Sequence, residues 1–186
     1  MAVQPDGRIV TAGMKEDDFA VARYNRDGSL DTSFDSDGKV TTDFGVAVDA
    51  ARGVALQPDG RIVAAGFGGD FVLARYNSDG SLDTSFDSDG KLITDFGAFN
   101  PATDVAIHPD GGIVAAGFSG DDEFDFALAR YRRDGTLDTS FDSDGKVTTN
   151  FGTSDVAQAV AIQPDGRIVA AGVSGGDFAL ARYLGR

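Results

Sequence analysis

The chain has 186 residues, 41% of them apolar, and its 30 acidic against 16 basic residues give a net charge of −14 at pH 7. This charge disfavours nucleic acid and anionic lipid as partners, because both need a basic patch. Cysteine is absent, which excludes disulfides, thiolate metal sites and cysteine nucleophiles. No apolar run approaches the roughly 18 residues of a membrane helix, so membrane insertion is not expected.

The chain repeats itself. Three blocks recur in the same order: a Pro-Asp-Gly string, a hexapeptide of the type Phe-Ala-Leu-Ala-Arg-Tyr, and the nonapeptide Leu-Asp-Thr-Ser-Phe-Asp-Ser-Asp-Gly. The first begins at Pro5, Pro58, Pro109 and Pro164, the second at Phe19, Phe71, Phe126 and Phe178, and the third at Leu30, Leu82 and Leu137. Such a period is typical of a repeat fold. We predict one domain, 1–186, with repeats at approximately 1–45, 46–97, 98–152 and 153–186.

One repeat, taken in chain order from Gly53, predicts four strands and no helix. Apolar runs at 53–57 and 61–66 flank Pro58-Asp59-Gly60, which suits a tight turn, so they form an antiparallel hairpin. A third strand covers 71–77. A fourth covers 91–96, after a link rich in Asp, Gly and Ser.

The second and third strands are apolar on both faces. Ile62 and Ala64 alternate with Val63 and Ala65, so both faces of the sheet must be covered. A small antiparallel sheet held between two like sheets is a propeller blade. A parallel β-helix fits less well, because its repeats are shorter and need no internal hairpin. The predicted fold is therefore an all-β propeller of antiparallel blades, with four repeats of about four strands.

The last repeat lacks its fourth strand, since the sequence stops at 183–186, where a fourth nonapeptide would begin. Residues 2–4 are a shortened counterpart of 53–57, which indicates a piece of a longer protein. We expect a single four-bladed ring and a monomer, because rings of four blades occur. The alternative is self-association of two copies to complete a larger ring.

The strings QPDGRIVAAG at 57–66 and GKVTTDFG at 38–45, together with the FALARY hexapeptide, resemble the bacterial delta-60 repeat. The resemblance implies a β-propeller-type fold of largely uncharacterised function and an extracellular or cell-surface location. It brings no catalytic residues. This chain departs from the family pattern at Asp35, Asp87 and Asp142, where a glycine is common.

The loops divide into two classes. The first-to-second and third-to-fourth connections of each repeat are nearly constant, whereas the second-to-third and repeat-to-repeat connections vary in length and chemistry. Constant loops indicate scaffold, and variable loops are where recognition can arise. The alternative is neutral drift of surface loops. The predicted ligand-binding residues lie on the variable face: Phe99, Asn100, Asp121, Asp122, Glu123 and Phe124.

The recurring charged residues are interpreted as scaffold. Arg23 and its three counterparts end the third strand of each repeat, and an arginine present once per blade suits a structural ion pair. The Asp-Ser-Asp-Gly strings could supply oxygens to calcium, but the closing glutamate of a calcium loop is missing, which favours turns. His108 has no neighbouring nucleophile, so it is interpreted as a polar residue flanking a turn. We predict no metal site and no cofactor.

These patterns favour a non-catalytic structural or interaction scaffold over an enzyme. A protein or glycan partner is expected at the variable face. The alternatives are a ligand-binding propeller, specific for glycans or stabilised by calcium, and then a hydrolase or lyase. Fold alone is no evidence for an enzyme.

Overall fold

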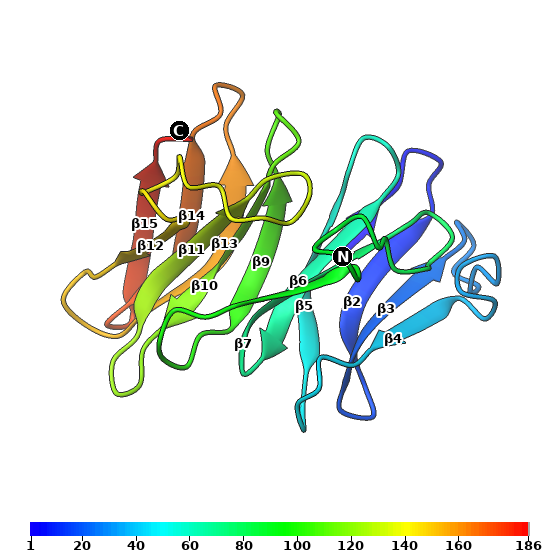
Figure 1. Cartoon of the computed structure of the whole chain (residues 1–186), viewed down its shortest axis with the longest axis horizontal. Helices are drawn as coiled ribbons and strands as arrows, with labels where there is room; N and C mark the ends of the chain where they lie inside the picture. The colour runs from blue at the N-terminus through cyan, green and yellow to red at the C-terminus, as the bar shows by residue number, and fades with distance from the viewer. Residues whose placement is uncertain (186) are drawn as a thin grey trace.

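The computed structural model describes residues 1–185 and contains fifteen strands in four antiparallel sheets (Figure 1). Within these residues no helix is long and apolar enough to cross a membrane. The first sheet consists of β1 (Ala2–Val3), β2 (Ile9–Lys15), β3 (Asp18–Tyr24) and β4 (Lys39–Thr42). The second consists of β5 (Ala50–Leu56), β6 (Ile62–Gly68), β7 (Asp70–Tyr76) and β8 (Lys91–Thr94).

The third sheet consists of β9 (Ala102–Ile107), β10 (Ile113–Ser119), β11 (Asp125–Tyr131) and β12 (Lys146–Thr149). The fourth has three strands, β13 (Asp155–Ile162), β14 (Ile168–Ser174) and β15 (Asp177–Tyr183). In every sheet the strands pair in chain order. The predicted all-β architecture of four repeats, the last with three strands, is confirmed.

The Pro-Asp-Gly turns set the register of the first hairpin in each sheet. In the second sheet Gln57 N donates to Arg61 O, Gly60 N donates to Gln57 O, and Leu56 pairs with Ile62. Asp59 Oδ1 accepts the backbone N–H of Arg61 at 3.1 Å. Gly60 adopts φ +89°, a conformation that costs glycine little because it has no Cβ.

The core lies between neighbouring sheets. We call the side of a sheet that meets the next sheet along the chain its forward face, and the opposite side its reverse face. The forward face of the second sheet, with Phe71 and Leu73, packs on Ile113 and Ala115 of the third. Its reverse face, with Ile62, shares a cluster with residues of the first sheet. Both faces are buried, as their alternating apolar residues predict.

Hydroxyl pairs also join neighbouring sheets. Thr42 Oγ1 lies 2.6 Å from Tyr76 Oη, and Tyr131 Oη donates to Thr94 Oγ1 at 2.8 Å. Burial raises the pKa of Tyr76, although its bond with Thr42 opposes the shift. The neutral phenol is therefore the form that the core holds.

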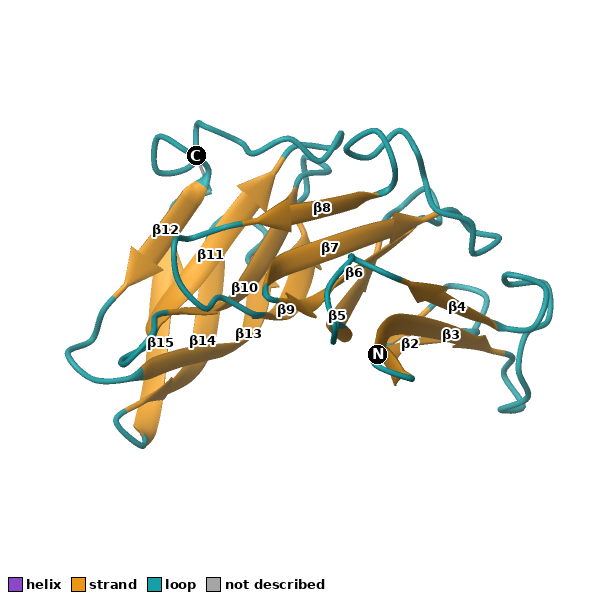
Figure 2. Cartoon of the chain, turned by 60° about the horizontal axis from the view of Figure 1, so that its bottom comes forward, coloured by secondary structure: helices purple, strands orange, loops and turns teal. Residues whose placement is uncertain are grey.

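The four sheets form an open arc, in which the first and fourth lie at opposite ends (Figures 1 and 2). Phe19, Phe71 and Phe126 are fully buried on the forward faces of the first three sheets, whereas their counterpart Phe178 is fully exposed and Leu180 is 62% exposed. A closed ring would cover both side chains with the reverse face of the first sheet. The prediction of a single closed ring of four blades is therefore wrong for this structure.

Candidate functional site

An aromatic cluster lies on the variable face, where the loops from β6 to β7 and from β10 to β11 emerge. Phe99 is at its centre, with ring centroids 5.4 Å from Phe67, 6.1 Å from Phe118 and 6.3 Å from Phe124. Phe118 and Phe124 are 4.8 Å apart. Phe99 remains 43% exposed, so the cluster offers part of an aromatic surface to solvent.

Two of the predicted residues, Phe99 and Phe124, meet in this cluster. Asp121 joins them, because its Oδ1 accepts the Phe99 backbone N–H at 3.4 Å. Asp122 and Glu123 are exposed in the same loop.

Asn100 is different. It is fully buried, its Oδ1 accepts the Phe71 N–H at 3.1 Å, and its Nδ2 donates to Asp70 Oδ1 at 3.0 Å. The structure therefore removes Asn100 from the predicted ligand-binding set, because its side chain links two sheets and does not reach solvent.

Phe67 and Phe118 were not predicted. Each follows the Ala-Ala-Gly string of a second strand, and the corresponding residues in the first and last repeats are Met14 and Val173. This difference between repeats is a signal that the sequence offers, but only the packing of neighbouring sheets shows that the two rings meet Phe99.

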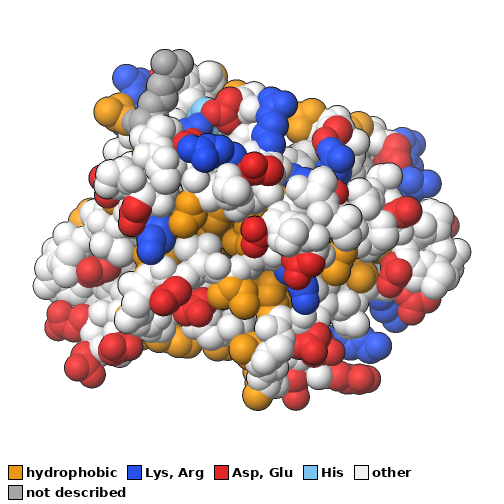
Figure 3. Space-filling model, viewed as in Figure 1, with side chains coloured by type: hydrophobic (Ala, Val, Ile, Leu, Met, Phe, Trp, Pro, Cys, Tyr) orange, Lys and Arg blue, Asp and Glu red, His pale blue; other side chains and the backbone are white. Residues whose placement is uncertain are grey.

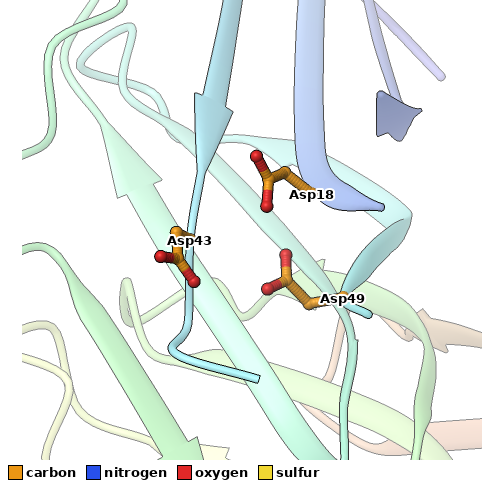
Figure 4. Close-up of side chains that lie close together, drawn as sticks. All are labelled: Asp18, Asp43 and Asp49. Atoms are coloured by element: carbon orange, nitrogen blue, oxygen red, sulfur yellow. The ribbon is translucent and has the colours of Figure 1, made fainter. Parts of the chain in front are cut away.

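Three carboxylates meet at the start of the second sheet (Figure 4). Asp18 begins β3, Asp43 follows β4 and Asp49 precedes β5, and their oxygens lie within 4.8 Å of one another. Asp49 is fully buried, and its two oxygens accept the backbone N–H groups of Phe19 and Phe44 at 2.5 and 3.1 Å. The buried carboxylate thus acts as a structural link between the first two sheets, in the place that Asn100 occupies one repeat later.

The recurring arginines hold each sheet to the loop that follows its third strand. Arg75 Nε donates to Asp83 Oδ2 at 2.8 Å and Nη2 to Ser85 Oγ at 3.2 Å, while Nη1 donates to a carbonyl of the next sheet, that of Arg133. Its guanidinium also lies 4.6 Å from the centroid of the Phe86 ring. Arg23 makes the same set of bonds in the first repeat, to Asp31, to Ser33 and to the carbonyl of Ser78 in the next sheet. The predicted scaffold role of these two arginines is confirmed.

The Asp-Ser-Asp-Gly strings form turns, as the favoured interpretation predicted. Asp37, Asp89 and Asp144 each accept the backbone N–H of the residue two positions later at 2.9 Å. Asp35 adopts φ +46° and Asp142 φ +45°. These left-handed conformations explain why a glycine suits the position in the family pattern.

The buried aspartates of the arginine clusters have lowered pKa values. A hydrogen bond from Ser33 is the main cause at Asp31, where Arg23 also contributes against the effect of burial. At Asp83 burial alone would raise the pKa, but bonds from Ser85 and the charge of Arg75 outweigh it. Both carboxylates therefore stabilise the fold in their ionised form.

We expect these pKa shifts to appear in acid unfolding. A carboxylate whose pKa is lower in the folded state stabilises the protein above its unfolded pKa, about 3.9, and loses this contribution as the pH falls through the folded value. Circular dichroism followed from neutral to acid pH should show unfolding that begins only below about pH 4. Asp83→Asn should be less stable at pH 7 and show a shallower pH dependence. An unchanged dependence would contradict the assignment.

His108 joins the third and fourth sheets at the constant face. Its Nε2 lies 3.0 Å from Gly166 O, and its Nδ1 lies 2.8 Å from Asp110 Oδ1. It also lines a cavity of about 570 Å³, together with Gln57, Arg61 and Arg75. Apart from His108, these residues belong to the constant part of the repeat, which the sequence predicts to be scaffold, and the arginine–aspartate pairs on this side agree with that prediction.

The comparisons with known proteins agree with this geometry. A family described as a β-propeller domain of unknown function, DUF5122, matches four segments, 4–34, 57–86, 108–141 and 163–185. The chain belongs to the DUF5122 β-propeller family. The predicted membership of a β-propeller repeat family is thereby confirmed, and each matched segment of the DUF5122 chain starts at the Gln or His that precedes a Pro-Asp-Gly turn.

Three solved structures are similar to the DUF5122 chain. A candidate gluconolactonase has 15% identity and a TM-score of 0.52, with 97% of this chain and 57% of that protein covered. A gluconolactonase from Xanthomonas campestris has 14% identity and a TM-score of 0.53, with 96% and 54% covered. A protein of unknown function from Bacteroides caccae has 14% identity and a TM-score of 0.53, with 89% and 55% covered.

At these identities the likeness shows the fold alone. The chain spans just over half the length of each of the three proteins. A search of the curated proteins found no match.

Proposed function

We propose that this DUF5122 chain is a non-catalytic propeller module that serves as a structural or interaction scaffold in a bacterial secreted or surface protein. One observation carries the proposal: the buried charged side chains of the first two sheets are bound by the fold itself. Arg75 and Asp83 bind each other, and Asp49 binds two backbone N–H groups. Groups held in this way are not free to act on a substrate.

The proposed secreted or cell-surface location rests on the resemblance to the delta-60 repeat. Acidic side chains are spread over the surface that Figure 3 shows, which suits a soluble module that does not bind anionic polymers. A protein partner would meet the variable face around Phe99.

An assay of lactone hydrolysis tests the non-catalytic proposal most directly, because two of the similar structures carry the name gluconolactonase. We expect no acid release from a panel of sugar lactones above the uncatalysed rate, measured by titration at constant pH. The heat-unfolded protein serves as the control. Turnover that the folded protein alone supports would overturn the non-catalytic proposal.

The aromatic cluster favours a second candidate function, glycan binding, because aromatic rings stack on the apolar faces of sugars. Phe99→Ala and Phe124→Ala should each abolish binding on a glycan array if the cluster is the site. Phe151→Ala is the matched control, since Phe151 is 42% exposed but makes an edge-to-face contact with Phe126, outside the cluster. Binding that survives both cluster substitutions would contradict this candidate.

Stabilisation by calcium is a further form of the ligand-binding alternative. A ligand that binds only the folded state raises its unfolding midpoint by mass action. Thermal unfolding with calcium and then with chelator tests this, and equal midpoints would exclude a tight calcium site.

A further inference from the structure

The loops of the variable face carry negative charge and no positive charge. They are the connections from second to third strands and from sheet to sheet, at residues 16–17, 43–49, 69, 95–101, 120–124, 150–154 and 175–176. They contain eight acidic residues and no lysine or arginine. A cationic group that approaches these loops therefore meets carboxylates without a competing cation in the same loops.

One acidic loop is held beside the exposed ring of Phe99. Gly120 N donates to Phe99 O at 3.1 Å, and Asp121 Oδ1 accepts the Phe99 N–H at 3.4 Å. The next two residues, Asp122 and Glu123, are exposed. In the described part of the chain, every ion pair uses an aspartate of the constant face. The carboxylates of Asp122 and Glu123 therefore have no cation of their own.

Cations already lie over phenylalanine rings next to this face. Lys91 Nζ is 5.8 Å from the centroid of the Phe44 ring, and Lys146 Nζ is 5.5 Å from that of Phe96. The negatively polarised face of an aromatic ring attracts a cation at such distances. The aromatic cluster itself follows this pattern, because the guanidinium carbon of Arg52 lies 5.9 Å from the centroid of Phe67.

Phe99, at the centre of the cluster, is 43% exposed, and among residues 1–185 no cation lies over its ring. A long basic side chain suits this position, since its apolar stem can cover the ring while its charged end stays near the surface. A neutral sugar would leave the carboxylates of Asp122 and Glu123 unpaired, and a metal ion would leave the ring uncovered. The combination of ring and carboxylates thus favours lysine or arginine.

We propose that the variable face binds a segment of a partner protein that is rich in lysine or arginine, at the junction between the second and third sheets. A basic side chain of this segment packs its stem on Phe99 and places its charge beside Asp122 and Glu123. Complementary charge steers the encounter and fixes the register of the bound segment. This inference rests on the proposed role as an interaction scaffold and names the chemistry of the partner.

The probe is a fluorescein-labelled heptapeptide in which three arginines alternate with glycine or serine. It is titrated by anisotropy into the intact protein at about 0.15 M salt, where attraction between distant charges is screened. A second peptide, with citrulline in place of every arginine, keeps the shape and removes the charge. We expect saturable binding of one arginine peptide per chain and binding at least about tenfold weaker for the citrulline peptide.

Variants separate the ring from the carboxylates. Phe99→Leu keeps an apolar side chain but removes the aromatic face, so it should weaken binding about threefold. Asp122→Asn combined with Glu123→Gln should weaken it about tenfold. Asp35→Asn combined with Asp142→Asn is the matched control, because it removes the same charge from exposed positions of the constant face. It should change binding by less than about twofold. Circular dichroism at the assay temperature shows that each variant is folded.

Arg52→Gln reveals the sign of the charge that binds. Without the repulsion from Arg52, a cationic peptide should bind about twofold more tightly at low ionic strength, whereas an anionic ligand would lose affinity. Weaker peptide binding by Arg52→Gln would overturn the proposal, as would the absence of saturable binding or full affinity in Phe99→Leu. Equal losses in the two charge-removal variants would also overturn it, because they would show diffuse attraction by the net charge. None of these results bears on lactone hydrolysis, which tests the non-catalytic role separately.

Discussion

Replacing Arg75 with alanine is expected to lower the free energy of unfolding by about 3–5 kcal/mol. The guanidinium is buried and binds Asp83, Ser85 and the carbonyl of Arg133. Its removal leaves the partly exposed Arg61, whose Nε lies 2.8 Å from Asp83 Oδ2, as the cation beside the buried Asp83 carboxylate. It also takes the Nη1 donor away from the Arg133 carbonyl, so two acceptors each lose a charge-assisted hydrogen bond. Urea unfolding at pH 7 measures the change, with the slope of the transition showing whether the folded state is otherwise preserved.

The fourth repeat supplies the control for this experiment. Arg182 occupies the same position of the same hexapeptide but is exposed, so Arg182→Ala should change the stability by no more than about 0.5 kcal/mol. A second variant, Arg75→Ala with Asp83→Asn, should recover part of the loss, because it removes a buried charge that only Arg61 would then neutralise. Equal losses at Arg75 and Arg182 would contradict the assigned ion pair.

Phe71→Ala is expected to cost about 3–5 kcal/mol, the range for removing a large side chain from a well-packed core. Phe71 is fully buried, and its ring centroid lies 4.9 Å from that of Phe96. The substitution would also leave a cavity between the second and third sheets, which are held together chiefly by apolar contacts of this kind. Thermal or urea unfolding followed by circular dichroism measures the loss.

Phe178→Ala is the matched control, because Phe178 begins the same hexapeptide in the fourth repeat and is fully exposed. Its removal should change the stability by no more than about 0.5 kcal/mol. A loss comparable to that at Phe71 would mean that the forward face of the fourth sheet is covered in solution. Repeating the measurement over a range of protein concentrations would then distinguish a second copy from closure within one chain.

The position of the candidate site follows from where the repeats differ. Constant residues such as Arg75 and Asp83 solve a packing problem that every sheet shares. Phe67, Phe99 and Phe118 are not repeated throughout, and they meet where the second and third sheets adjoin. We therefore expect a ligand of the variable face to bind at the junction between the second and third sheets.

Parts of the candidate site were predictable and parts were not. Phe99 and Phe124 could be singled out because their loops differ between repeats. Asn100 lies in an equally variable loop, yet it is buried as the counterpart of Asp49. Its role could have been inferred only by aligning it with Asp49 and Asp155, because burial in a loop depends on bonds to a neighbouring sheet.

The amino-acid sequence alone determined the repeat, its turns and the propeller architecture, because Pro-Asp-Gly and a strand that is apolar on both faces are local features that recur. It also pointed to the arginines as scaffold. The tertiary structure alone decided that the four sheets form an open arc and that Phe178 is uncovered. Phe71 and Tyr131 are buried together between the second and third sheets, and such packing between sheets cannot be derived from the order of residues within one repeat.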